Sequence, residues 1–504
     1  MVRPACRFRT PRTAAVLAAL ALAAGTAQAW DIKPQITLRE TITDNSSSDP
    51  GAKRRTDQVS EVSPRVRIIG GDDKNKLALD YQLRNVFYLH ESQRSYAAHN
   101  LNANAHLQNA ENTMGLDTRA AVSTEAQSLF SGLPVDVAGI SDNRAERRSF
   151  QARPYVQGEL GDWARWHAGY SGMVTTTDSP VFPRTSRQEW TARVDSTPAV
   201  GRLGWGAVVT DSRIDYSNRP DLDTRLAKLI LRLRVSPDLR LTAWGGREEA
   251  NYFLTPGSSA IHGVGFEYTP MERTRITGER EKRLFGDAYS FQLAHRSGMA
   301  TWNLSSSRSL VDFPDQFVLL GRGDPLAVWF NALAGRYPDP LERLQAAEQM
   351  MLRLGSPTVL NGEVGFNTSR VFVQRRSHAS VTLLGAANAV SLSMFRSDAE
   401  ALDGNLTLGD DFDFSPRLRQ SGWGLIWGRE VPGRASLVAR LMHTNYLATQ
   451  LQERRTVQDL LSVNYQLPVA PGAMGALGFR HVRTRFPASE QRENAVTAAI
   501  NVQF

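Results

Sequence analysis

The chain has 504 residues, 41% of them hydrophobic, with a formal net charge of +8 and one cysteine, Cys6. A single cysteine excludes an internal disulfide and a thiolate metal site. No basic run with interleaved aromatic residues is present, so the positive charge indicates no nucleic-acid partner. The length suggests two or three soluble domains, but no linker rich in Pro, Gly or Ser divides the chain.

Residues 1–29 have the pattern of a Sec-type signal peptide. Four arginines precede the apolar run Ala14–Ala24, and the small-residue site Ala27-Gln28-Ala29 follows it. Eleven apolar residues are too few to cross a hydrocarbon core, which takes about 20. We therefore expect cleavage before Trp30. Without the four signal arginines, 55 basic residues face 51 acidic ones, and the net charge falls to +4.

From Trp30 onward the hydrophobic pattern has a period of two, which indicates β-strands with one apolar and one polar face. The pattern is clearest in residues 30–43, 76–89, 226–235 and 460–467. Strands in globular proteins average about 5 or 6 residues, whereas about 9 to 11 tilted residues cross a bilayer. The predicted strands of 10 to 14 residues therefore fit a membrane barrel. No apolar stretch is long enough for a transmembrane helix.

The segments between the strands alternate between short turns and generally longer polar loops. Short turns occur near residues 160, 197, 236, 269, 297, 385, 431 and 468. Outer-membrane barrels have short turns on the periplasmic side and longer loops outside. We therefore predict an all-β fold: a transmembrane antiparallel β-barrel over residues 30–504, with about 22 strands in a range of 16 to 22. Periplasmic ends require an even number.

The last twelve residues, ENAVTAAINVQF, alternate up to the C-terminal Phe504. A terminal strand of this kind can close the barrel by pairing with the first strand. It also matches the signal expected by the outer-membrane assembly machinery of Gram-negative bacteria, so we expect Phe504 to be an assembly signal. Aromatic residues near the strand ends suit the girdles at the membrane interfaces, and we assign Trp163, Trp166, Tyr170, Trp205, Trp244, Tyr268, Trp302, Trp423 and Trp427 to them.

Residues 312–369 break the alternation and predict a short α-helical insert. The segments 324–335 and 339–355 are the expected helices, and Asp339 and Pro340 form a favourable N-terminus for the second. One interpretation is a surface subdomain in which the helices bury each other. The other is a plug or cap, because large barrels leave an aqueous lumen unless something fills it.

No catalytic motif is present, and the sequence predicts no enzyme and no cofactor. The nine histidines have no ligand spacing. Asp410, Asp411 and Asp413 are of the residue type that binds calcium, but a solvated acidic loop tip is the favoured interpretation, and we predict no metal site.

The polar parity of the strands points a set of basic side chains toward the lumen. These are Arg65, Arg67, Arg84, Lys228, Arg232, Arg234, Arg240, Arg440 and Arg480. Inward arginines favour anions in a pore. The alternative is a polar lumen wall in which they pair with inward acids such as Asp80.

The segments WDIKPQITLRETITDN at residue 30 and DPLERLQAAEQMMLRLGSP at residue 339 resemble the outer-membrane β-barrel family of the PEP-CTERM/exosortase system, and the chain is similar to barrels of exopolysaccharide operons. The resemblance implies a Gram-negative outer-membrane protein that serves as conduit or accessory in exopolysaccharide or sorted-protein secretion. The expected partners are outer-membrane lipid, the assembly machinery, exopolysaccharide and polysaccharide-export components. A general or substrate-specific porin and a closed scaffolding barrel are the alternatives.

Overall fold

The computed structural model describes residues 30–504 apart from 73, 134, 137, 180–181, 183, 198–201, 314–332, 334–336, 338–342, 344–345, 348–364, 366–367, 404–407 and 450–453. The predicted signal peptide and most of the predicted insert lie outside the described residues. Within the insert, Arg343, Ala346 and Ala347 are helical. No helix in the described part of the chain has the length and apolar character needed to cross a membrane.

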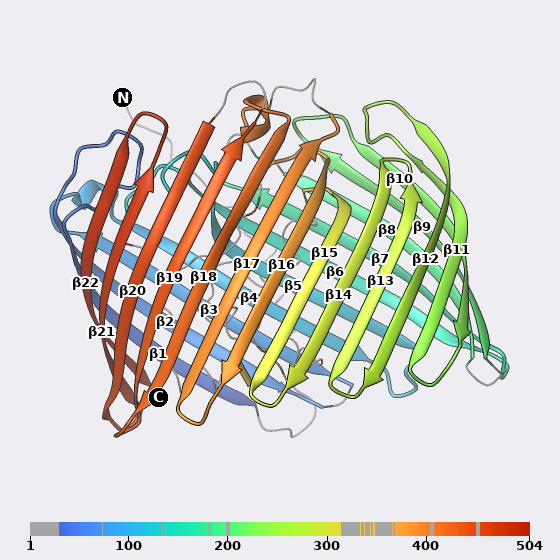
Figure 1. Ribbon diagram of the computed structural model, residues 1–504, viewed down its shortest axis with the longest axis horizontal. Coiled ribbons are helices and arrows are strands. Elements are labelled where there is room, and N and C mark those ends of the chain that lie inside the picture. Colours follow the sequence, from blue (N-terminus) through green and yellow to red (C-terminus); the bar gives the residue numbers. More distant parts are fainter. Residues whose placement is uncertain are drawn as a thin grey trace, which may run out of the picture.

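The described residues form 22 strands in one antiparallel sheet that closes on itself, which confirms the predicted fold class and strand number (Figure 1). The strands are β1 (Asp31–Thr43), β2 (Asp57–Gly71), β3 (Lys76–Tyr88), β4 (Tyr96–Gln108), β5 (Met114–Ala126), β6 (Arg144–Leu160), β7 (Ala164–Thr177), β8 (Thr185–Ser196), β9 (Leu203–Tyr216), β10 (Leu222–Arg234), β11 (Leu239–Ala250), β12 (Gly257–Met271), β13 (Thr274–Arg283), β14 (Gly286–Ser297), β15 (Ala300–Val311), β16 (Phe372–Leu384), β17 (Asn388–Ala401), β18 (Arg417–Val431), β19 (Ala435–Ala448), β20 (Arg454–Ala470), β21 (Ala473–Arg485) and β22 (Glu490–Gln503). Two short 3-10 turns, η1 (Ser92–Arg94) and η3 (Asp411–Asp413), lie between strands.

The barrel closes where β22 pairs with β1. The ladder runs from Thr43 opposite Ala495 to Gln35 opposite Gln503. Beyond it, the backbone N–H of Phe504 donates to the carbonyl of Pro34 at 3.0 Å. The first and last strands therefore satisfy each other's backbone groups, and neither is left as an open edge.

Each strand has an outer apolar face and an inner polar face. In β10, Leu229 and Leu231 are 69% and 55% exposed on the outer face, whereas Lys228 and Arg232 lie on the inner face. A face of exposed leucines on a closed barrel is suited to contact acyl chains. The period-two pattern of the sequence therefore separates the two environments of the wall.

Every connection at one rim is short, whereas the long connections all start from the opposite rim. The connections 72–75, 272–273, 298–299, 432–434 and 471–472 are short and lie at the same rim as the C-terminus, as Figure 1 shows. The long connections after β1, β5, β15 and β17 start from the other rim, because these strands end there. All eight predicted short turns fall at the first rim, here called the turn rim, and the second is called the loop rim.

The topology predicts which epitopes are reachable from outside the cell. Tags inserted between Leu402 and Pro416, or next to Thr449, should bind antibody on intact cells. Tags at 432–434 or 471–472 should bind only after the outer membrane is permeabilised, because outer-membrane barrels have their short turns on the periplasmic side. The reverse labelling pattern would refute this orientation, and tagged proteins that keep heat-modifiable gel migration serve as the folding control.

The closing strand predicts an assembly defect. Removing Phe504, or changing Phe504→Asp, should lower the amount of heat-modifiable protein in the outer membrane severalfold, because the last hydrogen bond to Pro34 and the terminal aromatic are both affected. The conservative Phe504→Tyr should assemble like the parent. Parental surface levels in Phe504→Asp would show that the terminal residue is no assembly signal.

Candidate functional site

The register of the ladders places all nine basic candidates on the inner face of the wall. This face is identified by residues 127–143, which contact β2, β3 and β19 to β21 together, as only a segment inside the closed barrel can. The large hydrophobic side chains of β19, β21 and β22, including Leu441, Phe479 and Val496, are exposed on the opposite face. The candidate site is therefore the lumen wall.

Several of the nine pair with inward acids, which is the alternative that the sequence left open. Arg65 donates to Asp80 at 2.8 Å, and Lys228 pairs with Glu281. Two further pairs are Arg232 with Asp195 at 2.8 Å and Arg240 with Glu267 at 3.5 Å. The pair of Lys228 and Glu281 is largely buried, whereas the other three are partly exposed, and exposed pairs contribute little to stability. Their main effect is to cancel part of the positive field along the wall.

The remaining candidates differ in burial. Arg84 donates to Gln82 at 3.2 Å, and Arg67 lies opposite Asp80 in the β2–β3 ladder. Arg440 is 4% exposed and contacts the sulfur of Met442 at 3.3 Å. Arg234 is exposed to the lumen and lies directly opposite Arg240.

Arg480 is the most strongly held of the nine. It is 5% exposed and donates to two carboxylates, Glu493 of β22 at 2.5 Å and Asp136 of the β5–β6 connection. Removing Arg480 would leave two buried carboxylates without their cation, which is strongly destabilising. Arg480 therefore fastens a loop to the wall, and its charge is not available to a solute.

The connection 127–143, here called the lumen loop, folds into the barrel. Its residue Val135 packs on Met442, Leu460 and Val482, which are inward side chains of β19, β20 and β21. On the other side, Ala138 packs on Val59, Val86 and Tyr88 of β2 and β3. The lumen loop therefore fills the part of the lumen that lies under these strands.

Sequence reasoning placed this segment among the outer polar loops and missed its inward path. The signal was present in the sequence: Leu129, Phe130, Leu133, Val135 and Ala138 are apolar, and all are at most 8% exposed in the structure. A loop with this content needs an apolar surface to cover. Only the fold shows that the surface is the lumen wall.

A buried charge cluster joins the loop-rim connections. Arg370, which is 1% exposed, donates to Asp410 at 3.1 Å and also pairs with Asp413. Arg219 pairs with Asp403 at 2.5 Å and donates to the carbonyl of Ser369 at 3.0 Å. These contacts tie together the connections before β10, β16 and β18.

The cluster corrects both interpretations of the acidic segment around Asp410. It is not a solvated tip, because Asp410 and Asp411 are 3% and 8% exposed. The cation between Asp410 and Asp413 is the Arg370 guanidinium, and Asp411 turns away toward Ser128. No group of three or more His, Cys, Asp or Glu in the described part of the chain is arranged to hold a metal ion.

Asp411 fastens the lumen loop at the loop rim. Its carboxyl accepts from Ser128 Oγ at 2.5 Å and from the backbone N–H of Leu129 at 2.7 Å. Burial raises the pKa of Asp411 to about 6, and the two hydrogen bonds offset only part of this effect. Near pH 6 the carboxyl therefore changes charge inside the contact between the two loops.

This pKa predicts a pH-dependent contact. The folded state binds the proton more tightly than the free carboxyl, whose pKa is 3.8, so the contact is strongest below about pH 4 and weakens as the pH rises through 6, by at most about 1.4 kcal/mol per pH unit. Deuterium uptake by residues 127–133, corrected for the intrinsic exchange rate, should be higher at pH 8 than at pH 5. In Asp411→Asn the difference should disappear. An equal pH response in the variant would show that another group is responsible.

Trp244 does not belong to the aromatic girdle, contrary to the sequence assignment. It points into the lumen, where its Nε1 donates to Glu281 at 2.7 Å. The girdle assignment holds for Trp163 and Trp205 near the turn rim, which stack on the outer face with ring centroids 6.0 Å apart. On β11 the odd-numbered Leu241 is exposed on the outer face, so the even-numbered Trp244 lies on the inner face and cannot belong to the girdle.

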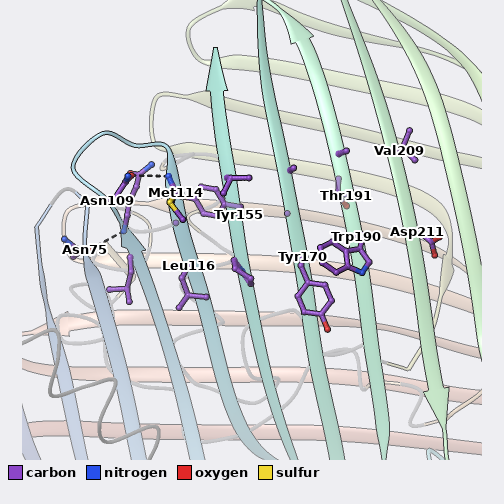
Figure 2. Close-up of a pocket in the computed structure, with 18 residues that line it drawn as sticks. Asn75, Asn109, Met114, Leu116, Tyr155, Tyr170, Trp190, Thr191, Val209 and Asp211 are labelled. Atoms are coloured by element: carbon purple, nitrogen blue, oxygen red, sulfur yellow. Dashed lines mark hydrogen bonds between the residues drawn. The ribbon is translucent and has the colours of Figure 1, made fainter. Parts of the chain in front are cut away.

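A hollow of about 1110 Å³ lies on the outer wall (Figure 2). It is lined by outward side chains of β4 to β9, among them Leu116, Tyr170, Trp190 and Val209. Tyr170 and Trp190 lie opposite each other in the β7–β8 ladder, with ring centroids 4.7 Å apart. This hollow faces the expected acyl chains, so we do not assign it to a water-soluble solute.

No protein-family model and no curated protein matches the chain. Among solved structures, the chain is similar to the FrpB iron transporter from Neisseria meningitidis (F5-1 variant), with 8% identity over 94% of this chain and 83% of that one and a TM-score of 0.48. It is similar to the siderophore receptor PirA from Pseudomonas aeruginosa, with 9% identity over 94% and 80% and a TM-score of 0.44. OpdK from P. aeruginosa, solved with vanillate, gives 11% identity over 94% and 98% and a TM-score of 0.32. These similarities assign no substrate to this chain.

Proposed function

We propose that this protein is an outer-membrane conduit of Gram-negative bacteria whose lumen is narrowed by its own loops. Its place in the membrane is supported by the closed ladder and by the exposed leucines of the outer face, such as Leu229 and Leu231. One observation carries the conduit proposal: the described residues of the lumen loop pack with side chains of β2, β3 and β16 to β21, and none of them lines the wall of β8 to β14. The charged wall of β8 to β14 carries a separate cavity.

The proposed cargo is exopolysaccharide, or a protein sorted by the PEP-CTERM system, with the barrel as channel or accessory. The resemblance of residues 30–45 and 339–357 to the barrel family of that system motivates this cargo. A charged and hydroxyl-rich inner wall suits a hydrated polymer, which exchanges hydrogen bonds with water for hydrogen bonds with the wall. In the source bacterium, deletion of the gene should lower the exopolysaccharide in the medium, and normal export would exclude this cargo.

The two alternatives differ in the state of the lumen. A porin requires a wide lumen that passes small solutes without a dedicated cargo. A scaffolding protein requires a closed lumen and uses its loops or turns to bind partners. The loop-rim charge cluster around Arg370, which is buried and fully engaged with aspartates, is compatible with either.

Conductance in planar bilayers tests the conduit. Replacing residues 129–140 by a short Gly-Ser linker should leave a folded barrel, because the strands close their hydrogen bonds without the lumen loop. The conductance should rise severalfold over the parent, since a segment is removed from the lumen. The same replacement of residues 91–94, at the rim, is the matched control and should leave the conductance unchanged.

The outcomes separate the three functions. A small parental conductance that rises on replacement supports the narrowed conduit. A large parental conductance that the replacement does not change favours the porin. Two closed forms favour the scaffold and contradict the conduit.

A further inference from the structure

A second cavity, of about 660 Å³, lies on the inner wall near the turn rim. Its lining comes from the turn-rim ends of β8 to β14 and includes Arg202, Arg232, Arg234, Arg240, Trp244 and Glu267. We call it the basic recess. Its volume lies within the range of about 300 to 1,000 Å³ that small-molecule sites occupy. The lumen loop lies against other strands and does not contribute to its lining.

The recess gathers positive charge that its acids only partly neutralise. Asp195 is shared by Arg193 and Arg232, and Glu267 is shared by Arg240 and Arg275. In the described part of the chain, Arg202 and Arg234 form no ion pair, and neither does Glu279. Six guanidiniums therefore stand against three carboxylates, which leaves a local charge of +3.

The arginines also lie unusually close to one another. Arg234 and Arg240 are direct cross-strand partners on the same face, and the backbone N–H of Arg234 donates to the carbonyl of Arg202 at 2.8 Å. Like charges directly opposite each other destabilise a sheet. A bound anion would remove this repulsion, and guanidiniums are well suited to bind carboxylates and phosphates in a bidentate manner.

Trp244 adds an aromatic surface beside these arginines. It lies opposite Gly263, and a β-carbon at Gly263 would fall 2.4 Å from Cε2 of Trp244. Gly265, two residues on, also has the indole as a neighbour. The glycines therefore let the ring lie along the wall, and its hydrogen bond to Glu281 fixes it there. Such a ring offers an electron-rich face to the weakly positive C–H groups of a sugar ring.

We propose that the basic recess binds an acidic saccharide, with the carboxylates of the sugar units on Arg234 and Arg240 and a pyranose face on Trp244. The neutral donors and acceptors Thr242, Thr277, Ser290 and Gln292 complete the lining and suit sugar hydroxyls. This proposal rests on the proposed function in that it names the chemical class of the cargo. A neutral glucan lacks the charge that the arginines require.

Binding is tested by calorimetry on the full-length protein in detergent, where both rims are open to solvent. The probes are tetragalacturonate and, as its neutral counterpart, maltotetraose. Tetragalacturonate should bind and maltotetraose should not. Arg234→Gln combined with Arg240→Gln should weaken tetragalacturonate at least tenfold and flatten its salt dependence, because the charge that attracts it is lost.

Two single variants distinguish the saccharide from a bare anion. Trp244→Leu should weaken tetragalacturonate severalfold while leaving sulfate binding unchanged, and Glu281 keeps Lys228 and Arg283 as partners in this variant. Arg153→Gln is the matched control: Arg153 is also inward and exposed but lies on β6, outside the recess. It should bind like the parent. Heat-modifiable migration of every variant verifies folding.

Equal tetragalacturonate binding by the parent and the double arginine variant would overturn the proposal. It would also be overturned if Arg153→Gln weakened tetragalacturonate binding as much as the double arginine variant does. Sulfate binding that competes fully, with no effect of Trp244→Leu, would overturn the saccharide part. If the barrel binds tetragalacturonate but neither the parent nor the loop-replaced form conducts, the recess proposal stands and the conduit proposal is refuted. If the barrel conducts but binds no tetragalacturonate, the conduit proposal stands and the recess proposal is refuted.

Discussion

The structure depends on one requirement: inside a bilayer, every backbone N–H and C=O of the spanning segment must find a partner within the protein. The pairing of β22 with β1 meets it, because it converts a sheet with two open edges into a closed ladder. The side-chain hydrogen bond of Asn501 to Thr37, at 2.7 Å, adds to the same seam from the lumen side.

Closure also fixes where each side chain lies. Successive residues point to opposite faces, so a strand has one apolar face toward lipid and one polar face toward the lumen. The lumen is then the one interior that the loops can reach. The lumen loop uses it as a soluble protein uses its core: Val135 and Ala138 are buried against inward apolar side chains on the two sides of the seam between β22 and β1. The barrel thus has two apolar environments, the bilayer outside and a small packed core inside.

Much of this could be predicted from the sequence because it follows from periodicity alone. The strand number, the two rims and the inward parity of residues such as Arg232 and Arg480 all depend on local patterns of two to fourteen residues. The path of the lumen loop could not be predicted, since it is set by partners far away in the chain. Asp411 and Leu129, which form one of its contacts, are 282 residues apart. Trp244 was misassigned because an aromatic residue was counted by type when its parity should have been decisive.

The arginines of the lumen differ in their exposure to water, and their pairing with carboxylates differs with it. Where the lumen is packed, two guanidiniums have carboxylate partners: Arg480 has Asp136 and Glu493, and Arg370 has Asp410 and Asp413. Such pairs are favoured because a buried charge that loses its partner costs several kcal/mol (~3 to 5). Arg440, which is 4% exposed, instead contacts the sulfur of Met442. In the basic recess the guanidiniums are exposed, and solvent screens the excess charge at small cost. The recess is therefore one part of the described lumen wall where positive charge exceeds negative charge and can act on a solute.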